Sequence, residues 1–313
     1  MKKGLLIGII IGTGLLTLAT IVGAIIVISG TKTKDETHVK NIAESFTNIN
    51  IDVETSDVEL KLADDNKTQL VLVENSKDFH KVEVKDNTLT VKYVSTRQWF
   101  EKISFNNKHS VTVFLPDVVY NKLTIEASTG DVKVSSFKFV SSNVKVSTGD
   151  VTFNKVNIAD TATFKSSTGD FSLKDISAKS LDVSVSTGKI NVEGAIVAEN
   201  AKFNASTGSM YLKKLAAKNL ETKSSTGNVT LDNVIIEKNI NIKTDTGNVK
   251  FVDSDAETLN IKTDTGNISG NLLTSKIIHG KSDTGRENYP HLTEGGLCEI
   301  ETDTGNIDIE IKK

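Results

Sequence analysis

The most regular feature of the chain is an alternation of apolar and polar residues that restarts every 19 or 20 positions. In "STGDVTFNKV", Val151 and Phe153 are apolar and their neighbours are polar, and this period of two predicts a β-strand. A second strand is predicted before the next Thr-Gly step, where Leu181 and Val183 lie five and three places before the serine. A third apolar pair lies between the two strands, so each unit is predicted to form a three-sided coil.

A Thr-Gly step marks every unit. Because a unit of this length cannot bury its own apolar side, equivalent positions of successive coils are expected to stack into one core. The predicted fold is an all-β, single-stranded parallel β-solenoid, and the usual handedness of parallel crossovers favours a right-handed β-helix. The predicted structural turns contain Gly130, Gly149, Gly169, Gly188, Gly208, Gly227, Gly247, Gly266, Gly285 and Gly305.

The two ends of the repeat are less regular. "INIDVETSDVELKL" matches the pattern with Ser56 in place of the glycine and is predicted to form the first coil, while "HKVEVKDNTLTVKYV" predicts a hairpin with its turn at Asp86 and Asn87. We interpret residues 46–127 as an N-terminal β subdomain that covers the open end of the solenoid repeats at 128–313. At the other end "NIDIEIKK" is expected to be the terminal strand, whose outward acids discourage end-to-end pairing of rods.

An uncharged apolar run at residues 4–29 predicts a membrane anchor. As a helix it would reach about 39 Å, which exceeds the roughly 30 Å hydrocarbon core of a bilayer. We therefore expect a single-pass protein of the cell membrane, with the anchor at 1–30, a polar linker at 31–45 and the bulk of the chain extracytoplasmic. The spacing of Gly4, Gly8 and Gly12 would allow two such helices to pack as a homodimer, although glycine is common in membrane helices for other reasons.

The charge of the chain bears on its expected partners, and its cysteine content bears on disulfides. The 40 acids and 37 bases give a net charge of -3 without a dense basic block, so nucleic acid is not an expected partner. Cys298 is the only cysteine, which excludes an internal disulfide. It falls in the inward column of its coil and is predicted to be a buried small apolar residue.

The tripeptide Asp-Thr-Gly, which carries the catalytic carboxylate of aspartic proteases, occurs in the last four units. The sequence places these aspartates where the six earlier units have serine, so a catalytic acid is excluded. The expected role is turn chemistry, in which the Ser or Asp oxygen caps backbone N–H groups and glycine permits a positive φ. The alternative is a Ca²⁺-binding column, although the glycine-dense nonapeptide of calcium-binding coils is absent. The column consists of Asp245, Asp264, Asp283 and Asp303.

Other candidate chemistry is sparse. Sites that act on polysaccharides need clustered acids with Arg or Lys, and Arg97 and Arg286 are the only arginines. The histidines lack metal-ligand spacing and are scattered at His38, His80, His109, His279 and His291. No catalytic residue and no cofactor is predicted.

An aromatic cluster in "STRQWFEKISF" has two interpretations. Trp99, Phe100 and Phe105 either form an exposed contact for a partner or the lipid surface, or plug the core of the first coils.

Coils ending in S-T-G-D or D-T-G-N, after one apolar N-terminal segment and the stretches "VTVFLP" and "LTIEASTGDV", resemble the bacterial solenoid family whose members are called putative adhesins. Lia-type cell-envelope-stress proteins are similar. The resemblance covers residues 49–313 and implies a right-handed β-helix displayed at the cell surface, with no catalytic residues to carry over. A departure lies in "DTGRENYPHLTEGGLCEIE", where Pro290 and the Gly295-Gly296 pair break the pattern, so that a loop there serves a partner or caps the rod.

Together these features predict a non-enzymatic, membrane-anchored, extracytoplasmic protein of adhesin, envelope-binding or stress-associated type. Its expected partner is an envelope polymer or a membrane protein. The alternatives are a polysaccharide-acting β-helix enzyme and a Ca²⁺-binding surface repeat protein.

Overall fold

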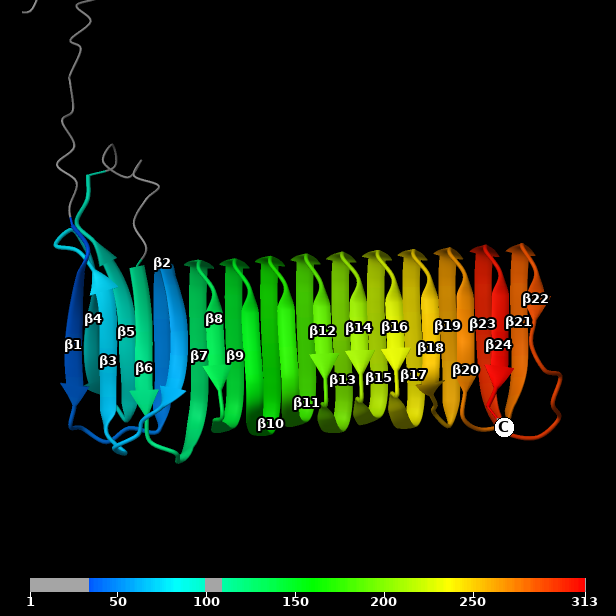
Figure 1. Ribbon diagram of the computed structural model, residues 1–313, viewed down its shortest axis with the longest axis horizontal. Helices are drawn as coiled ribbons and strands as arrows, with labels where there is room; N and C mark the ends of the chain where they lie inside the picture. Colours follow the sequence, from blue (N-terminus) through cyan, green and yellow to red (C-terminus); the bar gives the residue numbers. More distant parts are fainter. Residues whose placement is uncertain (1–33, 99–108, 313) are drawn as a thin grey trace, which may run out of the picture. The chain divides into compact units, whose positions relative to one another are not determined.

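The computed structural model describes residues 34–98 and 109–312. Every helix or strand in these two stretches is a β-strand, and the strands form one sheet wound into a solenoid (Figure 1). The strands at the N-terminal end are β1 (Glu36–Ile42), β2 (Asn48–Leu62), β3 (Thr68–Glu74), β4 (Asp78–Lys85), β5 (Thr88–Ser95) and β6 (His109–Leu115). The regular coils contain β7 (Val119–Thr129), β8 (Val132–Ser135), β9 (Lys138–Thr148), β10 (Val151–Thr168), β11 (Phe171–Thr187), β12 (Ile190–Glu193), β13 (Ile196–Thr207), β14 (Met210–Lys213), β15 (Ala216–Thr226), β16 (Val229–Asp232), β17 (Ile235–Thr246), β18 (Val249–Ser254), β19 (Thr258–Thr265) and β20 (Ile268–Leu272). The C-terminal strands are β21 (Lys276–Thr284), β22 (Glu287–Asn288), β23 (Gly296–Thr304) and β24 (Ile307–Ile311).

Equivalent positions of successive coils lie side by side in parallel pairing. β10 and β11 pair in register, with Phe153 opposite Leu173, and a shift of register between Ile158 and Thr161 bends β10. The same parallel pairing continues through β13, β15, β17 and β19. The predicted third apolar pair is inside, since Val156 and Ile158 are each 1% exposed. The parallel solenoid with a stacked apolar core is therefore confirmed.

The corner that follows the short strand of each coil was not singled out by the sequence pattern. Residues of several types adopt a left-handed backbone there, with φ between 47° and 71°. They are Ser136, Lys155, Asp175, Gly194, Lys214, Asn233 and Asp253. The chemical variety shows that this corner places no strict demand on the side chain.

The N-terminal end of the solenoid is not stacked in chain order. The first half of β2 pairs in parallel with β5 on one side and with β7 on the other. Its second half lies between β6 and β8 in the same way. β2 is thus a coil of the solenoid, as predicted, but the chain later returns to place β5 and β6 on its outer side.

Antiparallel strands complete this end. β3 pairs with β6 and β1 pairs with β3, both antiparallel. β4 and β5 form the predicted hairpin, and its turn residues Asp86 and Asn87 have φ values of 49° and 61°. Both values suit the two-residue turns that match the twist of a hairpin.

The C-terminal end is also out of chain order, and here the sequence-based expectation was wrong. β23 pairs with β19 and β21 lies on the other side of β23, while β24 lies between β20 and β22. The last strands of the chain are therefore inside the stack, and the coil of β21 and β22 forms its end (Figure 1). The outward acids of "NIDIEIKK" do not guard a terminal strand: Asp308 Oδ1 accepts a hydrogen bond from Asn288 Nδ2 at 2.7 Å.

The irregular loop between β21 and β23 makes this inversion feasible. The chain has already moved outward between β20 and β21, and this loop brings it back to β23. Its glycines lie against backbone: a Cβ on Gly295 would be 2.1 Å from the Ser275 carbonyl oxygen. Tyr289 in this loop packs on the core, and its hydroxyl donates to the Gly280 carbonyl at 3.1 Å. The position of Tyr289 favours the capping interpretation of this loop.

Several predicted features lie outside the described residues. These are the anchor at 4–29 with Gly4, Gly8 and Gly12, and the aromatic residues Trp99, Phe100 and Phe105. In the part of the chain that the structure describes, no helix is long and apolar enough to cross a membrane.

Candidate functional site

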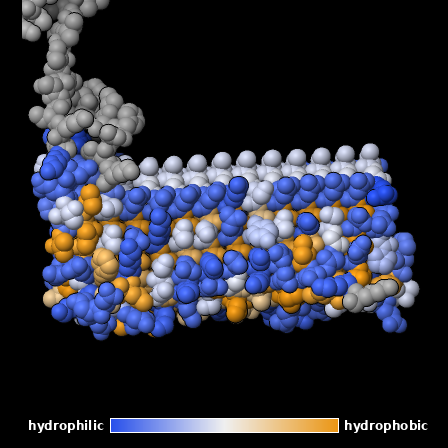
Figure 2. Space-filling model, in the orientation of Figure 1, coloured by the Kyte–Doolittle hydropathy of each residue, from blue (hydrophilic) through white to orange (hydrophobic). Residues whose placement is uncertain are grey.

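The Thr-Gly turns form one straight edge of the solenoid, which is the regular near-neutral row at the top of Figure 2. Gly130 packs on Ser56, and each later glycine of the column packs on a glycine of the neighbouring coil. Gly208, for example, has a φ of 145°, and a Cβ there would lie 1.8 Å from the Gly188 carbonyl oxygen. The glycines are thus required both for their backbone conformation and for the close approach of successive coils.

The oxygen that caps these turns comes from the residue after the glycine, where we had expected the residue before the threonine. The backbone N–H of Asp170 donates to Asp150 Oδ1 at 2.8 Å, and the N–H of Asp150 donates to Asp131 Oδ1 at 3.0 Å. Asparagine takes over this role in later coils, where the N–H of Asn267 donates to Asn248 Oδ1 at 2.8 Å. Three of the four coils with Asp before the threonine have asparagine after the glycine, so they keep the cap with an uncharged residue. The fourth has Arg286, whose backbone N–H donates to Asn306 Oδ1 at 2.9 Å.

The predicted calcium column does not assemble a cation site. Its spatial order is Asp245, Asp264, Asp303 and Asp283, because the last two coils are inverted. Asp283 instead pairs with Lys281 Nζ at 2.8 Å. No group of three or more His, Cys, Asp or Glu side chains in the described residues is arranged to hold a metal ion.

A buried polar cluster at the N-terminal end escaped the sequence analysis. Ser56 Oγ lies 3.0 Å from His80 Nε2, and His80 Nδ1 lies 2.9 Å from Glu74 Oε2. The order hydroxyl, imidazole, carboxylate is that of a nucleophilic triad. Ser56 and His80 are 24 residues apart and meet only because the β4–β5 hairpin folds back on β2, and the one sequence signal was serine in the glycine column.

Burial argues against a catalytic role for this cluster. Ser56 and His80 are each 1% exposed, and the Ser56 carbonyl lies directly under Gly130 in the stacked column. A nucleophile must be reachable by the carbonyl it attacks. We therefore interpret the cluster as a hydrogen-bonded core that joins the antiparallel strands to the first coils.

A second group of polar residues stabilises the same region. Burial alone would raise the pKa of Asp78, but hydrogen bonds from Arg97, Ser95 and Tyr93 hold that pKa below its usual value. Burial, followed by the hydrogen bond to Asp78, raises the pKa of Tyr93 to about 12. The Tyr93 ring contacts both His80 and His109, at centroid distances of 5.8 Å and 6.3 Å.

The buried histidine predicts a pH dependence. Burial lowers the pKa of His80, with smaller contributions in the same direction from His109 and Lys40, while Glu74 opposes them. Because the unfolded chain then binds the proton more readily, stability is complete above about pH 6.5 and falls as the pH drops below it. Chemical denaturation between pH 7.5 and 5 should show this loss, and the slope should flatten in His80→Gln but not in the control His279→Gln. An unchanged slope in His80→Gln would contradict the assignment.

Cys298 behaves as the sequence predicted. It is fully buried beside Leu259, and burial raises the pKa of its thiol to about 12. It is therefore a core residue and not a reactive thiol.

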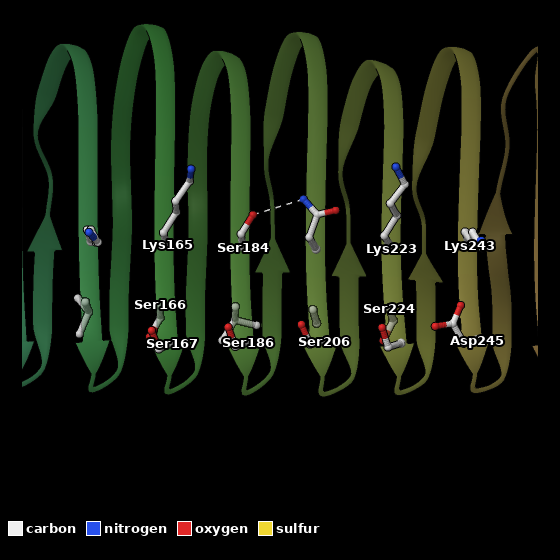
Figure 3. A pocket seen from close by; sticks show the side chains of 16 residues that line it. Lys165, Ser166, Ser167, Ser184, Ser186, Ser206, Lys223, Ser224, Lys243 and Asp245 are labelled. Atoms are coloured by element: carbon white, nitrogen blue, oxygen red, sulfur yellow. Dashed lines mark hydrogen bonds between the residues drawn. The ribbon is translucent and has the colours of Figure 1, made fainter.

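An open groove of about 530 Å³ lies on the strands that lead into the Thr-Gly edge. Lys145, Lys165, Lys223 and Lys243 line it, and Asp245 is the one acid in its lining, so these residues give a net charge of 4 − 1 = +3. Figure 3 shows Lys165 and Lys223 projecting on either side of Ser184, whose Oγ accepts a hydrogen bond from Asn204 Nδ2 at 3.3 Å. The sequence analysis missed this groove, although its signal was a lysine three places before the threonine in four of the six coils that line it.

The sequence matches the Toastrack DUF4097 family over residues 46–202 and again over residues 180–313. This chain belongs to the Toastrack DUF4097 family. No curated protein matches it. The resemblance to the solenoid proteins called putative adhesins is confirmed.

Solved structures of similar fold include proteins from Parabacteroides and Bacteroides. A putative lipid binding protein from Parabacteroides distasonis is 19% identical, with a TM-score of 0.54, and the match covers 77% of this chain and 98% of that one. A putative adhesin from Bacteroides fragilis is 16% identical, with a TM-score of 0.44, and the match covers 89% of this chain and 97% of that one. A putative adhesin from Parabacteroides distasonis is 14% identical, with a TM-score of 0.44 over 86% of this chain and 98% of that one. At such identities the first of these supports the solenoid fold of the Toastrack chain and nothing about its ligand.

Proposed function

We propose that this Toastrack protein is a non-enzymatic binding protein of the cell envelope, of adhesin type, held at the outer side of the cell membrane by residues 4–29. The observation that carries the binding role is the cationic groove on the regular face of the solenoid. A rigid array of stacked strands offers a broad, preformed contact surface, and such a surface binds without a large ordering cost. The uncharged length of residues 4–29 supports the anchor.

The arrangement of polar residues supports a non-enzymatic role over the polysaccharide-acting alternative. The triad-like cluster is closed to substrate by its burial. Asp131 and Asp150 accept hydrogen bonds in the ladder of the Thr-Gly edge, and Asp283 pairs with Lys281 Nζ at 2.8 Å. Incubating the purified protein with cell-wall polysaccharides should therefore release no new reducing ends or unsaturated products.

The anchoring proposal is tested on intact cells. The full-length protein should fractionate with membranes, and externally added protease should degrade it while a cytoplasmic control protein survives. A variant lacking residues 4–29 should leave the membrane fraction. Protection of the full-length protein from external protease would overturn the proposed orientation.

The binding role is tested by capture from envelope extracts. The immobilised full-length protein is compared with a variant that lacks residues 95–109, which include the aromatic residues of the second predicted contact. Equal capture by both proteins would assign binding to the solenoid face, whereas loss of capture in the deletion variant would assign it to the aromatic segment. Capture by neither protein would contradict the binding role.

A further inference from the structure

The lysines of the groove belong to one column of residues that runs along the solenoid. Lys145 pairs in register with Lys165, and Lys223 pairs in register with Lys243. Between these two lysine pairs the same column holds Ser184 and Asn204. The column therefore presents two cationic stretches separated by a short neutral one, all on the same face (Figure 3).

The charges in this column are balanced differently along its length. Toward each end a lysine faces an acid on the neighbouring strand: Lys92 lies 3.9 Å from Asp52, and Lys262 lies 3.1 Å from Glu301.

In the middle of the column, Lys145, Lys165 and Lys243 form no ion pair with any described residue. Lys223 contacts Glu221 at 2.6 Å, and Glu221 also lies 3.5 Å from Lys202. Lys145 also has Glu126 of β7 as its in-register neighbour, whereas the in-register neighbours of Lys165 and Lys243 are lysines and one serine. Like charges on adjacent strands are destabilising, so Lys165 and Lys243 maintain a repulsion that a bound anion would relieve.

We propose that the groove binds a linear polymer with phosphodiester groups along its backbone, laid across the coils parallel to the solenoid axis. The proposal deepens, and rests on, the envelope-binding function proposed above. Lys145 and Lys243 are five coil steps apart, about 24 Å at a spacing near 4.8 Å per step. The two lysine pairs are separated by three of these steps, about 14 Å, so one small anion cannot contact both pairs.

The chemistry of the lining favours phosphate over carboxylate. The cations are all lysines, which bind phosphate as compact point charges, and the groove has no arginine to form the bidentate contact that suits a carboxylate. A row of serine hydroxyls beside the lysines can donate to phosphate oxygens. This row consists of Ser167, Ser186, Ser206 and Ser225. Asp245 lies two residues after Lys243 on β17, so the anionic path ends at the coil of Lys243.

The test uses the full-length protein in detergent micelles and a fluorescent poly(glycerol phosphate) as the probe. The groove variant carries Lys145→Gln, Lys165→Gln, Lys223→Gln and Lys243→Gln. The control variant removes the same charge elsewhere, through four exposed lysines on the strands or turns that follow the Thr-Gly step. These changes are Lys133→Gln, Lys174→Gln, Lys189→Gln and Lys250→Gln.

The wild-type protein should bind the probe with an affinity that falls steeply with salt, because lysines that neutralise a polyanion release its counterions. The groove variant should bind at least about ten-fold more weakly, and the control variant should stay within about two-fold of wild type. Glycerol 3-phosphate and the carboxylate polymer hyaluronate should compete poorly.

Several outcomes would overturn this assignment. They are unchanged binding by the groove variant, an equal loss in the control variant, or equal competition by hyaluronate. Its failure is separable from failure of the proposed function: a protein that is exposed on cells but does not bind the probe refutes only the groove assignment. A protein that binds the probe but is not exposed on cells refutes the envelope role.

Discussion

Gly208→Ala is expected to lower the free energy of unfolding by about 3 kcal/mol or more, enough to reduce the yield of folded protein sharply. The new Cβ would lie 1.8 Å from the Gly188 carbonyl oxygen, on a residue whose φ is 145°. Neither atom is at the end of a flexible side chain, so the two coils would have to separate. Because coils stack only on their neighbours, a break here disconnects the two halves of the rod. Urea denaturation of the purified variant measures the effect.

Gly194→Asn is the matched control at the opposite corner. Gly194 also has a positive φ, of 71°, but a Cβ there would meet the movable end of the Asp175 side chain. Asn233 already occupies the equivalent corner with a φ of 55°. We expect a change within about 1 kcal/mol. If the two variants proved equally stable, the packing explanation for the glycine column would be wrong.

Lys276→Met is expected to destabilise the protein by about 3 to 5 kcal/mol, because it leaves a buried carboxylate without its cation. Lys276 is 1% exposed, its Nζ lies 2.6 Å from Asp255 Oδ1, and it also donates to Thr274 Oγ1. Lys276 is the first residue of β21, and Asp255 directly follows the last residue of β18. Thermal and urea denaturation of the variant would measure the loss.

The double variant Lys276→Met with Asp255→Leu completes a thermodynamic cycle. Replacing both partners with apolar residues removes the stranded charge, so most of the lost stability should return. If the losses of unfolding free energy from the two substitutions instead add, the ion pair is not the source of the effect. The loss in Lys276→Met would then come from the packing of the Lys276 side chain.

The sequence predicted the solenoid because each coil repeats the same physical requirement. Val151 and Phe153 alternate with polar neighbours, and the same alternation at every unit admits only one way to bury all the apolar residues. The order of coils at the two ends could not be predicted in this way. The strands that end at Thr284 and Thr304 both have an apolar residue five places before the aspartate, and they differ inside the alternation only by Gly280 in place of Ile300. A Thr-Gly step and an apolar residue in both strands do not by themselves show which of them stacks on the strand that ends at Thr265.

The candidate sites also differ in whether the repeat pattern could predict them. The lysine column could have been predicted from the sequence, because residues at the same position of successive repeats lie side by side in the solenoid. The contact of Ser56 with His80 was not, since it depends on a hairpin that interrupts the repeat. The cap of the Thr-Gly turn was assigned to the wrong neighbour of the glycine. Ser and Asp on either side can both accept a hydrogen bond, and only the geometry of the stack selects the residue after the glycine.

The inverted C-terminal coils have a consequence for how this rod is completed. β21 joins the sheet through β23, so the coil at the tip has no neighbour to settle on until the strands encoded after it are in place. A chain synthesised amino end first can wind most of its coils as it appears, but it cannot close its tip until the final strands arrive. A copy cut anywhere before β23 would keep a frayed, protease-sensitive end. The closed tip therefore distinguishes chains that contain β23 and β24 from chains that lack them.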